Sequence, residues 1–222
     1  MAPTTRRERR PALTHERVVA AAVELADDQG IEALSMRKLA QALGVEAMSL
    51  YHHVANKDDL LDAMVDLVFS EIATPAEAGP WRTEVRSRCT SLRDVLLRHP
   101  WAVGRLNSRR RPGMATLQHH DAVIGCLRAG GFSVRGAAHA FATIDAYVYG
   151  FAVQELSLPM EPGEDTSELA IEILASAPAD QLPHLAEMTA EFVGRPDYAF
   201  ANEFEPGLDL ILDALDRTRR PG

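Results

Sequence analysis

The sequence contains little cysteine and no long hydrophobic run, and each absence excludes a class of protein. Cys89 and Cys126 are the only cysteines, and no second ligand motif stands near either. We therefore expect reduced thiols in a reducing compartment rather than a disulfide scaffold. No stretch approaches the roughly 18 apolar residues of a membrane span, and no apolar segment follows the N-terminal arginines as in a secretory signal. These features predict no membrane association and a cytoplasmic location.

Catalytic and metal-binding motifs are also missing. The sequence has no G-x-S-x-G, no glycine-rich phosphate loop and no H-E-x-x-H. The pairs His52-His53 and His119-His120 diverge by about 100° on a helix, whereas a helical zinc site uses histidines four residues apart. We expect no enzyme, no metal and no cofactor. The alternative in the enzyme class is a helical hydrolase or isomerase built on Asp145 and His120.

The charge balance is acidic, with a net charge of −9, although nucleic-acid-binding proteins are usually basic. Residues 1–60 carry 8 Lys and Arg against 9 Asp and Glu, and the rest carries 15 against 23. Before position 18, two glutamates accompany five arginines: Arg6, Arg7, Arg9, Arg10 and Arg17. Residues 1–12 form a basic flexible arm that can lie along phosphates. A merely solvated tail is the equal alternative.

Helix signals are dense between Thr14 and Val54. Thr14 can cap a helix whose apolar residues keep helical spacing until Gly30. Ser35 can cap a second, short helix, and Gly44 can end it in the left-handed conformation. A third helix of roughly two turns follows. Its apolar side is supplied by Val45, Leu50 and Val54. Two short helices joined by a glycine turn are the geometry that presents a helix to the DNA major groove.

The remainder of the sequence also predicts helices, so the fold class is all-α. A fourth helix carries Leu61, Val65, Val68 and Ile72 on one side. Prolines and glycine in residues 74–80 then mark a boundary, which gives a DNA-binding domain at 13–73 and a larger domain at 80–222. Helices of the larger domain are expected at about 81–98, 100–107, 113–129, 133–157, 166–177, 181–193 and 203–219.

Three segments of the first domain carry a family resemblance: Ser35-Met-Arg-Lys-Leu-Ala-Gln-Ala-Leu-Gly-Val45, Leu50-Tyr-His-His-Val54 and Asn56-Lys-Asp-Asp-Leu-Leu61. They resemble the DNA-binding domain of the tetracycline-repressor (TetR-like) transcriptional regulators. Weaker similarity lies at His99-Pro100, Ala129–Ser133 and Phe204–Leu215. The resemblance implies a homodimeric regulator, most simply a repressor, that binds a palindromic double-stranded DNA operator and is released by a small-molecule effector. A plain helical hairpin is the alternative.

The resemblance also implies which residues contact DNA. Arg37 matches an arginine that can reach a guanine, and Tyr51 and Lys57 match residues that bind phosphates. Ala47 and Met48 stand where the tetracycline repressor has Gln-Pro, so we expect a different operator sequence. The remaining DNA-contacting candidates are Lys38, Ser49, His52 and His53.

An effector pocket in the larger domain would combine apolar walls with a few polar groups. The candidates are Trp101, Arg105, Asn107, His120, Asp145, Tyr147 and Tyr149. Asp145 interrupts an apolar helix, so it needs a partner such as Arg105 or a donor on the ligand. The aromatic candidates could instead be core residues. Residues 104–108 lack the histidine that helps the tetracycline repressor bind its magnesium–drug chelate, so tetracycline is not the expected ligand.

A dimer interface is expected from two helices. The helix at 133–157 is apolar on two sides, and the helix at 203–219 carries a stripe of leucine and isoleucine. One copy of each helix from both subunits could form a four-helix interface. Our candidates for it are Ala152, Leu208 and Leu212, with Ala152 and Leu212 at the centre. A purely structural dimer would not require Arg37, Tyr51 and Lys57 together.

Overall fold

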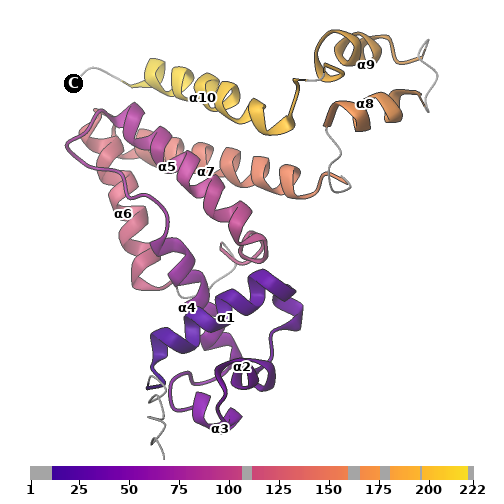
Figure 1. The fold of residues 1–222 in the computed structure, drawn as a ribbon. Helices are drawn as coiled ribbons and strands as arrows, with labels where there is room; N and C mark the ends of the chain where they lie inside the picture. Colours follow the sequence, from indigo (N-terminus) through magenta and orange to yellow (C-terminus); the bar gives the residue numbers. More distant parts are fainter. Residues whose placement is uncertain (1–11, 107–111, 160–165, 176–180, 196, 220–222) are drawn as a thin grey trace, which may run out of the picture. The chain divides into compact units, whose positions relative to one another are not determined.

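Helices make up all the regular structure of the described residues, which confirms the all-α fold class (Figure 1). The structure is a computed structural model, and it describes residues 12–106, 112–159, 166–175, 181–195 and 197–219. The chain divides into two compact units. The first contains residues up to Glu71 together with Arg98–His119, and the second contains Ile72–Leu97 and the residues from His120 onward.

The first unit begins with the predicted three-helix arrangement, although the third helix, expected to have roughly two turns, is only four residues long. It contains α1 (His15–Gln29), a 3-10 turn (Ile31–Ala33), α2 (Met36–Leu43), α3 (Ala47–Leu50) and α4 (Lys57–Ser70). The side chains of Thr14, Ser35 and Asn56 accept hydrogen bonds from backbone amides and so cap α1, α2 and α4. Helix α1 packs against α2 and α4. Their shared core is fully buried at Val18, Ala22, Leu39, Leu60, Met64 and Val68.

Residues 98–119 group with this first unit, although the sequence predicts them in the second domain. The reason is a set of polar contacts that sequence spacing does not reveal. The indole nitrogen of Trp101, in the 3-10 turn η2 (Pro100–Ala102), donates to Asp27 of α1 at 2.7 Å. Asp66 of α4 accepts from the backbone nitrogen of Thr116 at 3.0 Å and from its hydroxyl at 2.9 Å. Asp66 thereby satisfies amide groups in the first turn of α6 (Met114–Ala129).

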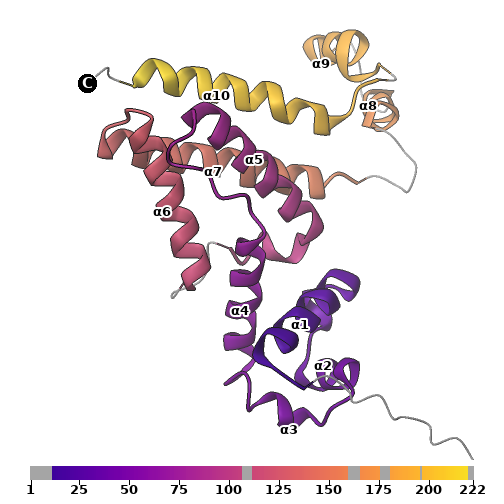
Figure 2. The same ribbon diagram turned by 60° about the vertical axis from the view of Figure 1, so that its left-hand side comes forward.

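The second unit contains most of α5 (Trp81–Arg98), the end of α6, and α7 (Val134–Leu156), α8 (Thr166–Ala175) and α9 (Pro183–Met188). A π-helical turn (Thr189–Val193), the 3-10 turn η4 (Phe200–Glu203) and α10 (Phe204–Thr218) complete it. Helices α5, α7 and α10 lie side by side (Figure 2). These positions confirm the expected helices to within a few residues at their ends. The segment expected as a helix at 100–107 forms only a 3-10 turn followed by turns in its described part.

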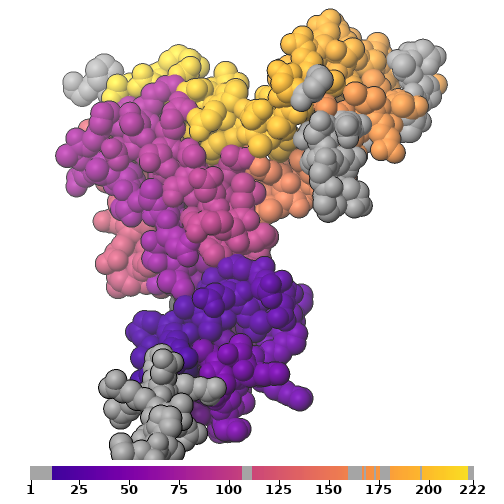
Figure 3. All heavy atoms as spheres, in the orientation of Figure 1, coloured from indigo at the N-terminus to yellow at the C-terminus, as the bar shows by residue number. Residues whose placement is uncertain are grey.

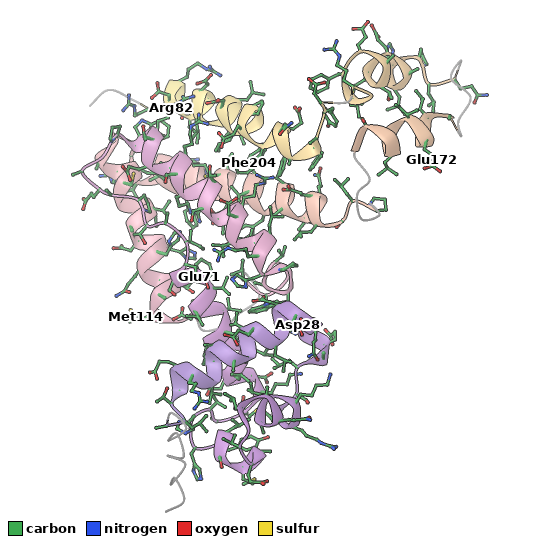
Figure 4. The ribbon with its side chains drawn as sticks, viewed as in Figure 1. Asp28, Glu71, Arg82, Met114, Glu172 and Phe204 are labelled. Atoms are coloured by element: carbon green, nitrogen blue, oxygen red, sulfur yellow. The ribbon has the colours of Figure 1, made fainter. Side chains whose placement is uncertain are left out.

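Charged residues hold α5 and α10 together along one side. Arg82 pairs with Asp209 at 3.0 Å and with Asp213 at 2.6 Å, and Arg86 pairs with Glu205 and Asp209. Figure 4 shows Arg82 beside α10. These side chains are partly exposed, so each pair contributes little by itself. The apolar packing beneath them stabilises the contact more, because Leu92, Phe204 and Leu208 are almost completely buried.

Candidate DNA-binding site and effector site

Two short helices of the first unit form a helix-turn-helix. Gly44 ends α2 with φ 66°, in the left-handed region that glycine adopts without strain. Helix α3 continues into turns, in which the backbone amide of Val54 donates to the carbonyl of Leu50 at 3.0 Å. Leu50 is 0% exposed and Val54 is 2% exposed, so these two residues anchor the segment in the core. The rest of the segment faces outward.

The DNA-contacting candidates lie on that outward side. Met48 is 73% exposed and Tyr51 is 45% exposed. The exposed class also includes Arg37, Lys38, His52 and Lys57, while Ala47, Ser49 and His53 are intermediate. Figure 3 shows these helices at the surface of the first unit, in violet shades. All nine candidates therefore belong to the helix-turn-helix or its flanks, and none is buried.

Two contacts fix the ends of this segment. The imidazole Nδ1 of His15, at the start of α1, donates to the backbone carbonyl of His53 at 2.9 Å. The carboxylate of Asp59 accepts from the backbone amide of Ala55 at 2.9 Å, just before Asn56 caps α4. Lys57 is the first residue of α4 and stays exposed. Sequence patterns do not reveal the contribution of His15, because its partner is 38 residues away.

The effector candidates are divided between the two units. Trp101 and Arg105 belong to the first unit, and His120, Asp145, Tyr147 and Tyr149 belong to the second. Trp101 is 8% exposed and bonded to Asp27, which agrees with the alternative that it is a core residue. Asn107 lies outside the described residues.

Asp145 pairs with Arg88 of α5. Arg88 Nη1 and Asp145 Oδ1 are 2.5 Å apart, and the two side chains are 0% and 14% exposed. Arg88 was not among the expected partners, and it reaches Asp145 because α5 packs on this side of α7. The neighbouring Cys89 thiol is also buried, and burial raises its pKa to about 11. Arg88 could have been found from sequence, since it lies on the apolar stripe of α5 that contains Val85 and Leu92.

Half-buried polar and aromatic side chains follow one another on the same side of α7. Phe141, Asp145 and Tyr149 are spaced by four residues, which places them on one stripe of the helix. The ring of His120 from α6 packs edge-on against Phe141, with ring centroids 5.2 Å apart. This stripe, with Arg88 and His120 opposite it, is called the Asp145 stripe below. It combines aromatic surface with charged groups, as a small-molecule site does.

Tyr147 belongs to a different region from Tyr149. Its hydroxyl donates to the backbone carbonyl of Phe204 at 2.7 Å, and its ring stacks on Phe204 with centroids 5.6 Å apart. It lines an open groove of about 360 Å³ on α7, η4 and α10. The other lining residues are Ala146, Gly150, Phe151, Gln154, Phe200, Glu203 and Gly207.

The three dimer candidates are buried within the protomer itself. Ala152, Leu208 and Leu212 are each 0% exposed, so they cannot be the contact surface for a second copy. The expectation for these residues is therefore wrong, because α7 uses that side to pack on α10 of its own chain. The outward apolar side of α7 carries Ala138, Ala142, Ala146 and Val153. On α10 the outward apolar residue is Leu210, which is 73% exposed.

The described ranges contain neither a metal site nor a membrane span. No cluster of three or more His, Cys, Asp or Glu side chains within them has the arrangement of a metal site. No helix in this part of the chain has the length and apolar character needed to cross a membrane.

Comparisons with known proteins agree with this geometry. Residues 18–64 match the family described as bacterial regulatory proteins, tetR family, and residues 74–219 match the tetracyclin repressor-like C-terminal domain. An HTH-type transcriptional regulator of Saccharopolyspora erythraea is 42% identical over 149 residues, which cover 67% of this chain and 63% of that protein, less than two thirds of its length. The repressor DrrR1 of Streptomyces coeruleorubidus is 33% identical, covering 93% and 78% of the two chains. The class C tetracycline repressor of Escherichia coli is 32% identical, covering 93% and 92%.

Solved structures show the same architecture. ActR of Streptomyces coelicolor in complex with actinorhodin has a TM-score of 0.78 and 29% identity, covering 95% of this chain and 100% of that one. BioQ with its double-stranded DNA operator has a TM-score of 0.63 and 27% identity, covering 92% and 98%. This chain, with its capped helix-turn-helix and its larger helical unit, is therefore a DNA-binding transcriptional regulator. It belongs to the tetR family of bacterial regulatory proteins.

Proposed function

We propose that this regulator is a repressor that binds a palindromic DNA operator as a homodimer and is released from it by a small molecule. The observation that carries the proposal is the segment Ala47–Val54 of the first unit, α3 and the turns after it, which is named the reading segment. Leu50 and Val54 are buried, while Met48 and Tyr51 are exposed, as are Arg37 and Lys57. A helix held in this way can enter the major groove, and a two-fold dimer places two such helices at half-sites about one helical turn apart. The regulator acts in the cytoplasm, where its DNA is, and we assign it no catalytic activity.

Within this proposal the DNA-contacting residues have two tasks. Lys57 and Tyr51 contact phosphates, which sets the register without reading sequence. Arg37 contacts a guanine, whose O6 and N7 accept two hydrogen bonds from a guanidinium. Lys38, Ser49, His52 and His53 contact base edges or phosphates, and Ala47 lies close to the bases.

The effector is proposed to bind in the second unit, at the Asp145 stripe. Asp145, Tyr149 and His120 offer polar groups beside aromatic surface, and Arg88 supplies a positive charge that is already paired with Asp145. The structure of ActR, a protein of similar fold, contains actinorhodin, and this supports the proposal that the present chain also binds an organic molecule. Binding would shift the population toward a dimer whose reading segments no longer match the operator. The groove beside Tyr147 is the second candidate for the ligand.

The homodimer is proposed to form through the outward side of α7 and α10. Ala138, Ala142 and Ala146 are small, so helices can approach each other closely there, and Val153 and Leu210 add larger apolar surface. An exposed leucine and an exposed alanine-rich face favour a self-complementary contact, since a two-fold axis applies the same surface twice.

The experiment that tests the proposal is selection of genomic DNA fragments by the purified full-length protein, followed by footprinting. The expected result is a small set of fragments that share two inverted half-sites and are protected over about two major-groove faces. Recovery of fragments with no common sequence would contradict the proposed function. The genes beside the recovered site would then guide the choice of effectors to test against the bound complex.

A further inference from the structure

Met48 stands out among the residues of the reading segment because it is both apolar and highly exposed. Its side chain is 73% exposed, although Leu50, two residues later, is 0% exposed. A single exposed apolar residue is ordinary on a protein surface. Met48, however, is the second residue of α3, and the first residues of a reading helix are those that contact base edges.

The chemistry of this side chain limits what it can recognise. A thioether has no N–H or O–H group and is only a weak acceptor, so it cannot form the hydrogen bonds that identify guanine, adenine or cytosine. Ala47, the residue before it, has no polar side chain either. The one apolar group that an unmodified base displays in the major groove is the C5-methyl of thymine.

We propose that Met48 is a specificity-determining residue that contacts the C5-methyl group of one thymine in each operator half-site. The proposal rests on the proposed function, because it requires α3 to lie in the major groove. Contact between the flexible, polarizable thioether and the methyl group removes apolar surface of both from water. A thymine at this position is favoured over every base that lacks the methyl group.

The test replaces thymine by deoxyuridine, one position at a time, in an operator duplex selected by the wild-type protein from random DNA. This change removes the C5-methyl group and leaves every hydrogen-bonding group of the base in place. Binding of the full-length protein is measured by fluorescence anisotropy. At one position per half-site we expect wild-type affinity to fall about fourfold, and about 15-fold when both half-sites are changed.

Variants of Met48 then assign the effect to this residue. Met48→Ala should bind the thymine and deoxyuridine duplexes equally well, whereas Met48→Leu should keep most of the difference. Lys57→Ala is the matched control, since it should weaken binding to both duplexes and leave their ratio unchanged. Because Met48 is exposed, its replacement should not change the thermal unfolding of the protein.

Two results separate failure of this inference from failure of the proposed function. One is a selected operator for which the ratio of affinity for the thymine duplex to affinity for the deoxyuridine duplex is the same in Met48→Ala and the wild type at every position. In that case Met48 does not read a thymine methyl group. If no duplex is enriched over random DNA, the proposed function itself fails. A deoxyuridine effect that disappears in Met48→Ala supports the inference.

Discussion

Arg88 and Asp145 form an ion pair between α5 and α7, with Nη1 and Oδ1 2.5 Å apart and side chains 0% and 14% exposed. A paired charge in a helical core contributes little net stability by itself, because removing both ions from water offsets their attraction. Breaking such a pair is different, since it leaves one charge buried without its counter-charge.

The pair therefore predicts a non-additive stability pattern. Asp145→Ala should lower the free energy of unfolding by about 3–5 kcal/mol. The double variant Arg88→Met/Asp145→Leu, which replaces both charges by apolar groups, should recover most of that loss. Urea unfolding followed by circular dichroism measures both. If the loss of stability in the double variant equals the sum of the losses in Arg88→Met alone and Asp145→Leu alone, the two side chains do not interact as the structure has them.

Thiol reactivity tests the packing of the second unit. Burial raises the pKa of Cys89 to about 11, so the neutral thiol is favoured in the folded protein. At pH 8 only about one molecule in a thousand would carry the reactive thiolate there, and Cys126 is buried as well. We expect both thiols to react slowly with a disulfide reagent in the native protein and rapidly in denaturant. Rapid labelling of one thiol in the native state would show an opening that this packing does not contain.

The assembly prediction compares two leucines of the same helix. Leu210 is 73% exposed and Leu212 is 0% exposed. Leu210→Glu should yield folded monomers with collapsed operator affinity, because a monomer loses the effective concentration of its second half-site. Leu212→Glu should instead unfold the protomer, since it buries an unpaired charge. Met114→Glu, at a site 65% exposed, is the control that should remain dimeric. Light scattering gives the masses, and a Leu210→Glu dimer with full operator affinity would show that the interface lies elsewhere.

The three-helix unit is predictable from sequence because its signals are local. Ser35, Gly44 and Asn56 each act on amides or carbonyls within a few residues, and each lies at a cap or turn. The partner of Asp145 is not predictable from its own helix, since Arg88 is 57 residues away. Periodicity places Ala152 on the wrong surface because α7 is apolar on two sides. The spacing of apolar residues reveals both apolar sides of α7, but it does not say which side faces the protomer's own core.

One arginine variant and one lysine variant separate the reading of bases from the positioning of the protein on phosphates. Arg37→Ala should cost about 1–3 kcal/mol on the selected operator and much less on random DNA. Lys57→Ala should weaken binding to both and reduce the slope of affinity against salt concentration by about one. Both side chains are exposed, so neither change should affect folding. Equal losses on both DNAs for Arg37→Ala would assign that residue to phosphate contact.

Sequence-specific DNA binding by a two-fold dimer is tested most directly by a single titration. Wild-type protein is titrated at physiological salt against the selected operator, a duplex with one half-site scrambled and a fully scrambled duplex. We expect the operator to be bound at least about a thousandfold more tightly than the scrambled duplex, with the single half-site in between. Equal affinity for all three duplexes would contradict this mode of binding.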